Sequence, residues 1–166
     1  MAKFHLLDAA RMGFSMDSAK LRNSRCDSLY RGRSEEEYAA IAPYLFQYDL
    51  EDDFDLWLRE NAGQSWGIGL VANEPMEVVH KHFRKFLLVQ AEDGQELYFR
   101  FYDPRVLRVF LPTCDPEQLK EFFGPVLEFH IEDPINQHML VCRQNDGFLK
   151  VEKYPWNFSE LNNLMN

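Results

Sequence analysis

Runs of apolar residues along the chain change in length and spacing, and each pattern predicts a type of element. Short apolar or aromatic runs at 4–9, 44–48 and 66–72 are typical of buried strands. Apolar positions that recur three and four residues apart predict one helix over 51–61 and another that begins after its cap, Asn73. The first half of the chain should therefore alternate between strands and helices.

Two N-terminal segments give weaker patterns. Residues 12–33 mix Ser, Asp, Asn, Arg and Gly with scattered apolar side chains and are predicted to be irregular. Ser34 followed by Glu37 forms a capping-box pattern, which predicts a short helix over 35–42 that ends before Pro43. The side chains expected to face inward from this helix are those of Tyr38, Ile41 and Ala42.

The most informative stretch runs over 97–112, with the sequence LYFRFYDPRVLRVFLP. It follows a strand pattern at 87–90 and the turn pair Asp93-Gly94, which together predict a β-hairpin. Because the stretch begins with mostly aromatic residues, the returning strand is predicted over 95–102.

The end of this predicted strand meets the start of a helix. Asp103 is a favourable N-cap, because its carboxylate can accept hydrogen bonds from N–H groups of the first turn, and Pro104 suits the first helical position. On an alternating strand, Arg100 shares a face with Tyr98 and Tyr102. The pattern therefore places a cation between two rings, directly before a helix.

The second half of the chain repeats this cap and then changes to strands. Asp115, Pro116 and Gln118 form a second cap pattern, which predicts a short helix that ends at Gly124. The alternation of apolar and polar residues over 126–131 predicts a strand after it.

A hairpin and a short helix are predicted at the end of the chain. The turn sequence Asn-Asp-Gly joins strands at 139–143 and 148–152, and 156–165 can form the helix. These elements predict a fold of the α/β (α+β) class, in which a mixed β-sheet has helices packed against it. Because the chain has no internal repeat or low-complexity linker, 1–166 is expected to form one compact domain.

Composition agrees with a single domain and narrows the classes of partner. The 166 residues are 46% hydrophobic and 14% aromatic, which is enough to build a core. A net charge of −9 disfavours nucleic acid as a partner, because affinity for phosphate backbones comes from cationic side chains. The three cysteines are widely spaced, which fits a reducing cytoplasm better than a disulfide framework. Without a long apolar run, membrane insertion is not expected.

No pattern of residues indicates catalysis, a cofactor or a metal site. His80 and His82 are two residues apart on a predicted helix, whereas a helical pair of metal ligands needs a spacing of three or four. The glycine-rich segment 63–69 runs into a strand rather than from a strand into a helix, so it does not form a phosphate loop. The acidic run at 51–55 is better explained by the helix dipole than by a calcium loop. We therefore expect no enzyme activity, no cofactor and no metal ion.

Four residues at the junction of strand and helix form the candidate binding site: Arg100, Tyr102, Asp103 and Arg105. In the structural interpretation, Asp103 caps the helix, Arg100 pairs with an acidic group while stacking on a tyrosine, and Arg105 lies in solvent. In the functional interpretation, the junction presents a fixed edge that binds another protein. Composition alone favours the structural interpretation, because caps are commoner than binding edges.

These residues also carry a resemblance to a known family. The strings RFYDPR and FFGP, with LLDAAR, SLYRG, WGIGLVA, HKHFRKFLLV and EDGQELYFRF in the same order as in the family, cover about residues 6–129. They resemble a bacterial family once catalogued only as a domain of unknown function, whose members are adaptor chaperones for type VI secretion effectors. Many relatives continue into a further helical lobe, whereas residues 130–166 of this chain hold only the hairpin and tail.

The resemblance implies a cytoplasmic, non-catalytic adaptor. Such a protein binds a cognate secreted effector and helps to load it onto the valine-glycine repeat spike protein, VgrG. Because the further lobe is missing, the sheet and the corner from Arg100 to Arg105 are expected to hold the effector. Two other classes stay open: an immunity protein whose negative charge occludes the active site of a toxin, and, with the least support, an enzyme.

Overall fold

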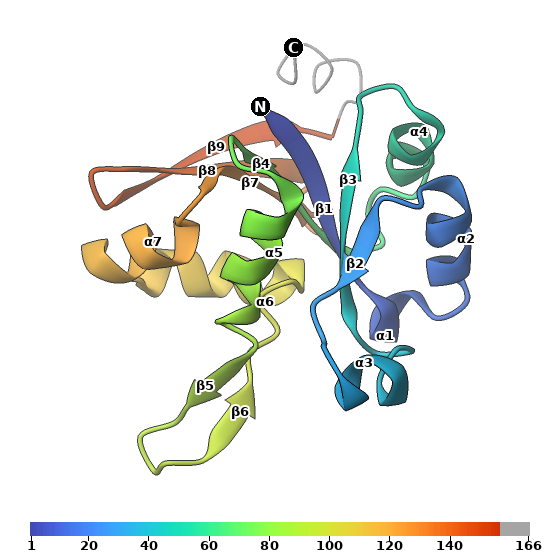
Figure 1. The fold of residues 1–166 in the computed structure, drawn as a ribbon. Coiled ribbons are helices and arrows are strands. Elements are labelled where there is room, and N and C mark those ends of the chain that lie inside the picture. Colours follow the sequence, from blue (N-terminus) through green and yellow to red (C-terminus); the bar gives the residue numbers. More distant parts are fainter. Residues whose placement is uncertain (157–166) are drawn as a thin grey trace.

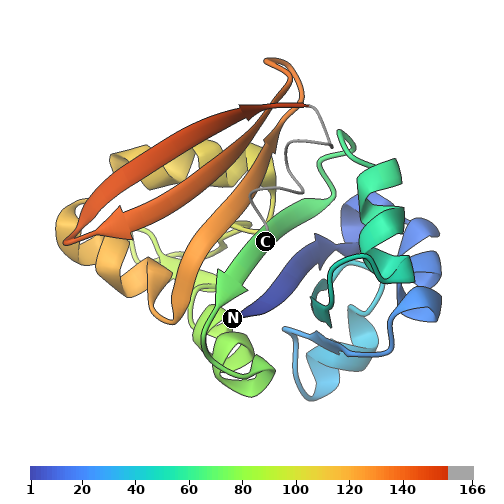
Figure 2. The same cartoon turned by 90° about the horizontal axis from the view of Figure 1, so that it is seen from above.

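The computed structural model describes residues 1–156 of the protein. Within this part of the chain, seven strands form one antiparallel sheet in the order β2-β3-β1-β4-β7-β8-β9, and helices lie on both of its faces (Figures 1 and 2). The strands are β1 (Ala2–Asp8), β2 (Cys26–Ser28), β3 (Pro43–Tyr48), β4 (Gly67–Ala72), β7 (Val126–Asp133), β8 (His138–Asn145) and β9 (Phe148–Pro155). This architecture confirms the predicted α/β class.

The helices divide into two groups that cover different parts of the sheet. The first group is α5 (Met76–Arg84), α6 (Pro104–Phe110), the short 3₁₀ turn η1 (Leu111–Thr113) and α7 (Pro116–Phe123). The second group is α1 (Ala9–Met12), α2 (Ser15–Arg22), α3 (Arg33–Glu37) and α4 (Asp53–Glu60). No helix among the described residues is long and apolar enough to cross a membrane.

Strand β1 lies inside the sheet, between β3 and β4, and contributes to both cores. Side chains alternate along a strand, so Phe4 and Leu6 join the core beneath α5, α6 and α7, whereas Leu7 joins the core beneath α1, α2 and α4. All three side chains are fully buried. The strand ends at Asp8, which is also fully buried and caps α1.

The segment 12–33 is more regular than its composition predicted. It contains α2 and β2, and α1 ends at its first residue. In α2 the buried residues are Met16 and Ala19, so the helix has too narrow an apolar stripe for its period to stand out in the sequence. Tertiary contacts with α4 and β3, rather than local pattern, hold this region in place.

Two other helices differ from their predicted bounds. Helix α3 is shorter than the predicted 35–42, and the side chains of Tyr38 and Ile41 are 41% and 49% exposed, so the prediction that they face inward was wrong. Ala42 is buried, as predicted. Helix α5 takes its cap from Pro75, two residues after the predicted cap at Asn73.

Strands β5 (Leu88–Gln90) and β6 (Glu96–Tyr98) form a separate two-stranded arm that projects from the body of the protein (Figure 1). The hairpin was predicted, but its second strand ends at Tyr98 instead of continuing to residue 102. The chain then turns inward, because the ring of Phe101 is fully buried and stacks on that of Phe83 with centroids 5.3 Å apart. The predicted alternation of Tyr98, Arg100 and Tyr102 on one strand was therefore wrong.

The C-terminal hairpin forms as predicted, with longer strands. Strands β8 and β9 pair from His138 with Pro155 to Asn145 with Phe148. Asp146 and Gly147 at the turn have φ angles of 50° and 83°, which is the geometry of a tight hairpin turn in which both central residues are left-handed. The helix predicted over 156–165 lies outside the described residues apart from Trp156.

Candidate functional site

Three segments that are distant in the sequence meet at one corner of the fold. Asp8 ends β1, Tyr30 follows β2, and residues 100–105 lead from the arm into α6. We define the motif corner as Asp8, Tyr30, Arg100, Tyr102, Asp103 and Arg105. Its members come from the strings LLDAAR, SLYRG and RFYDPR, so these strings share one location in the folded protein.

Asp8 is the buried anion of the motif corner. Its side chain is 0% exposed; Oδ1 accepts a hydrogen bond from the backbone N–H of Ala10 at 3.0 Å, and Oδ2 accepts one from Nη2 of Arg100. The hydrogen bond to Asp8 raises the pKa of Arg100 above its ordinary value. Arg100 therefore neutralises a carboxylate that would otherwise be buried and unpaired, which is a costly arrangement in a protein interior.

Asp103 is the second buried carboxylate of the motif corner, and Arg105 donates hydrogen bonds to both of its oxygens. The Oδ1 atom accepts hydrogen bonds from the backbone N–H of Arg105 at 2.9 Å and from its Nε at 3.0 Å, while Oδ2 accepts one from Nη2 at 2.6 Å. Burial opposes ionisation of Asp103, but these hydrogen bonds outweigh it and hold the pKa of the carboxyl below its ordinary value. Asp103 is thus ionised at neutral pH and caps α6, as predicted.

Two tyrosine hydroxyls complete the motif corner. Tyr102 is almost fully buried, and its hydroxyl lies near that of Tyr30. Burial, together with the nearby hydroxyl of Tyr30, raises the pKa of Tyr102, so its hydroxyl stays protonated over the physiological range. The segment after β2 therefore lies beside the segment before α6.

The structure brings the four predicted site residues together but exposes them unequally. Tyr102 and Asp103 are 4% and 2% exposed, whereas the side chains of Arg100 and Arg105 are 43% and 55% exposed. The capping role of Asp103 and the acidic partner of Arg100 are confirmed. Contact with another protein stays a prediction, and at this corner the two guanidinium groups are the parts that could make it.

The two histidines of α5 serve as internal links. Nε2 of His80 lies 2.7 Å from the carbonyl oxygen of Ser28, and Nε2 of His82 lies 2.8 Å from that of Phe122. They tie α5 to the end of β2 and to α7 respectively, which explains why residues two apart on a helix are both buried. Among residues 1–156, no group of three His, Cys, Asp or Glu side chains is placed to hold a metal ion.

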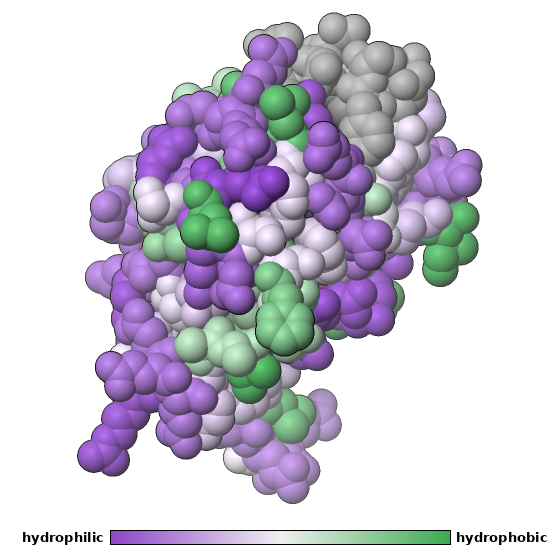
Figure 3. Space-filling view, turned by 90° about the vertical axis from the view of Figure 1, so that its right-hand side faces the viewer, coloured by the Kyte–Doolittle hydropathy of each residue, from purple (hydrophilic) through white to green (hydrophobic). Residues whose placement is uncertain are grey.

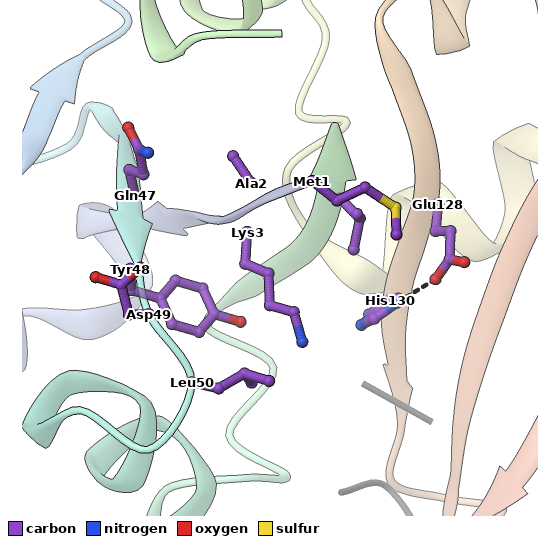
Figure 4. A pocket seen from close by; sticks show the side chains of 10 residues that line it. Met1, Ala2, Lys3, Gln47, Tyr48, Asp49, Leu50, Glu128 and His130 are labelled. Carbon is purple, nitrogen blue, oxygen red and sulfur yellow. Dashed lines mark hydrogen bonds and ion pairs between the residues drawn. The ribbon is translucent and has the colours of Figure 1, made fainter. Parts of the chain in front are cut away.

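A hollow of about 430 Å³ with a mixed polar and apolar lining lies on the sheet beside β1, β3 and β7 (Figure 4). Glu128 and His130 point into it from β7, with Nε2 of the imidazole 3.0 Å from the carboxylate, and Nε of Arg143 donates to the same carboxylate at 2.8 Å. The hydrogen bond from His130, followed by that from Arg143, lowers the pKa of Glu128 to about 2. This carboxylate is therefore ionised, and Arg143 balances its charge within the sheet. It is a poor proton acceptor at neutral pH.

Sequence reasoning missed Asp8, the partner of Arg100. The two residues are 92 positions apart, so no local pattern connects them. An aspartate at the end of an apolar run also has the local pattern of a helix cap, which gives it a role without any distant partner. The resemblance gave only an indirect signal of this pair, because LLDAAR, which contains Asp8, and RFYDPR, which contains Arg100, are both among the strings that carry it.

A family model described as a domain of unknown function, DUF4123, matches residues 4–121 of the chain. The matched range includes the whole motif corner, the arm and helices α1 to α6. No curated protein and no solved structure matches the chain.

Proposed function

Because the chain belongs to the DUF4123 family, which is associated with effector adaptors of the type VI secretion system, we propose that it is a cytoplasmic adaptor, or chaperone. It binds a cognate secreted effector and helps to load that effector onto the VgrG spike protein. It acts without catalysis and without a cofactor. The observation that carries this proposal is the family match over residues 4–121.

Surface chemistry supports a protein as the partner. The net charge of −9 is unfavourable for nucleic acid, which needs cationic side chains to neutralise its phosphates. Large apolar side chains are nevertheless exposed in several places, including Phe14 at 94%, Tyr98 at 65% and Phe148 at 72%. The face that carries α2 and α4 shows separate hydrophobic groups between hydrophilic ones (Figure 3). An acidic protein with apolar contact points is suited to binding other proteins.

Recovery of the partners from a producing cell tests the proposal. The tagged chain should co-purify with a secreted effector and with the spike protein, both identified by mass spectrometry. Deletion of its gene should abolish secretion of that effector while the secretion apparatus still releases its own tube protein. Recovery of neither partner would refute the adaptor role.

The same cells distinguish an adaptor from an immunity protein. The toxin domain of the recovered effector is expressed alone, with and without this chain. An adaptor should leave the cells as sensitive as before, because its task is delivery. Survival that depends on this chain would instead support the immunity interpretation and contradict the proposal.

A further inference from the structure

A recess lies between the base of the arm and the segment that follows β2. It has a volume of about 230 Å³, and its lining includes Tyr30, Leu87, Leu88 and Tyr98, with Arg84 and Lys85 at the side. We name it the arm recess and define it by these six residues. Its two walls come from elements with no strand pairing between them, since β5 and β6 pair only with each other within the described sheets.

Two tyrosines line the arm recess, and a third contacts one of them. The ring of Tyr30 contacts that of Tyr98 within the recess, with centroids 6.4 Å apart, and also that of Tyr38, with centroids 6.5 Å apart. Tyr38 and Tyr98 are 41% and 65% exposed, and Leu88, which pairs with Tyr98 in the arm, is 47% exposed. Tyrosine supplies a large contact area at a low cost in conformational entropy, so tyrosines are frequent at centres of protein binding.

The arm exposes apolar side chains that no other part of the described chain covers. Its strands pair through three residue pairs, and every residue of both strands is exposed, including Val89 and Leu97. An isolated two-stranded hairpin is at best marginally stable in water. An additional contact that covers the apolar side chains of the arm would therefore be favourable.

The charge beside the arm recess is opposite to that of the whole chain. Lys81, Arg84 and Lys85 are exposed on the last turns of α5, and no carboxylate among the described residues forms an ion pair with any of them. Nε of Arg84 donates to the carbonyl oxygen of Leu29 at 3.1 Å, which positions its guanidinium but leaves its charge unneutralised. In a protein of net charge −9, these three cations form a local site for carboxylates.

We propose that the arm recess binds a short extended peptide segment that carries aliphatic side chains next to carboxylates. An aliphatic side chain of the segment enters between Tyr30, Leu88 and Tyr98, and its carboxylates face Arg84 and Lys85. A volume of about 230 Å³ suits one or two side chains rather than a folded domain. The inference rests on the proposed function in one respect: the segment belongs to the secreted effector.

Selection from a phage-displayed library of random twelve-residue peptides on the immobilised full chain tests this chemistry directly. The selected peptides should be enriched in Asp, Glu and aliphatic residues. Fluorescence anisotropy with one selected peptide should show affinity that falls by at least about tenfold in Tyr98→Ser and in Lys85→Glu. Higher salt should also weaken binding, because part of the attraction is between exposed charges.

Matched variants elsewhere control for general effects of the substitutions. Phe148→Ser removes a ring that is 72% exposed on β9, and Lys120→Glu reverses a charge on α7. Both should bind the peptide within about twofold of the unchanged chain. Selection of no peptide, selection of peptides without acidic residues, or equal affinity in the arm-recess variants would overturn the inference. Tighter binding of a single-stranded oligonucleotide than of the peptide would also overturn it.

Effector capture separates failure of this inference from failure of the proposed function. If the effector co-purifies equally with the unchanged chain and with Tyr98→Ser, the arm recess is not the contact, and the adaptor role stands. If the peptide binds the arm recess but the unchanged chain captures no effector, the recess stands as a peptide site and the adaptor role fails.

Discussion

The ring of His82 occupies the space that a side chain on Gly124 would need. A Cβ atom built on Gly124 would lie 2.3 Å from Cε1 of His82, closer than real Cβ contacts come. Gly124 ends α7 with a φ of 49° and a ψ of −113°, a backbone conformation that favours glycine. The glycine of the FFGP string is therefore fixed by two independent requirements, backbone conformation and the histidine packed against it.

Gly124→Ala should destabilise the protein by about 2–4 kcal/mol, because it combines backbone strain with overpacking against His82. Gly13→Ala is the matched control. Gly13 has a similar backbone conformation, with a φ of 54° and a ψ of −129°, but a Cβ atom added to it would meet no other atom within 4 Å. Urea unfolding of both variants gives the comparison. Equal losses of stability would mean that the contact with His82 adds nothing.

Arg100→Ala should destabilise the fold by about 2–4 kcal/mol, because it leaves the carboxylate of Asp8 buried and without its cation. Asp8→Asn removes the buried charge, so the double variant should lose less than the sum of the two single changes. Arg105→Ala should cost less than Arg100→Ala, since Asp103 keeps its hydrogen bond from the backbone N–H of residue 105. Chemical unfolding of the four variants measures the coupling. Additive losses would show that Arg100 does not stabilise the fold through Asp8.

Stability should fall as the pH drops below about 6.5. Burial, with a smaller contribution from His130, lowers the pKa of His5 to about 3 in the folded protein, whereas an unfolded histidine titrates near 6.5. Between these values the unfolded chain binds more protons than the folded chain, so acid favours unfolding. Burial lowers the pKa of His82 as well, which acts in the same direction.

His5→Gln should reduce this dependence. Between pH 7.5 and pH 5.0, the unfolding free energy of the variant should decrease by about 1–2 kcal/mol less than that of the unchanged chain. The variant His138→Gln, on β8, controls for the loss of an imidazole elsewhere. Urea unfolding at the two pH values provides the measurement. A His5→Gln variant with the same pH dependence as the unchanged chain would contradict the role given to His5.

Arg105→Glu should reduce effector capture several-fold if the motif corner contributes to binding, because more than half of the Arg105 side chain is exposed. Arg105→Gln is the necessary comparison, since both variants remove the cation beside Asp103 but only one introduces an anion. Thermal unfolding must first show that both variants are folded at the assay temperature. Full effector capture by a folded Arg105→Glu variant would exclude Arg105 as a contact.

The elements that could be predicted from the sequence are those whose signals are local. The caps at Asp103 and Asp115, the turn at Asp93-Gly94 and the hairpin through Asp146 all depend on residues within a few positions of one another. Local hydrogen bonds and permitted φ angles decide such features, and both can be read from neighbouring residue types. The fold class followed from their order.

Which elements cover one another could not be predicted, because it depends on contacts between residues that are distant in the sequence. Periodicity shows that a side chain has a preferred face, but it does not show which element lies on that face, so Tyr38 and Ile41 were expected to be buried and are exposed. The second strand of the arm, β6, ends at Tyr98 because burial of Phe101 outweighs its strand pattern. The pairing of Arg100 with Asp8 likewise depends on folding of the chain between them. A buried charge is stabilised by whichever partner the fold brings within a few ångströms, and sequence separation does not encode that distance.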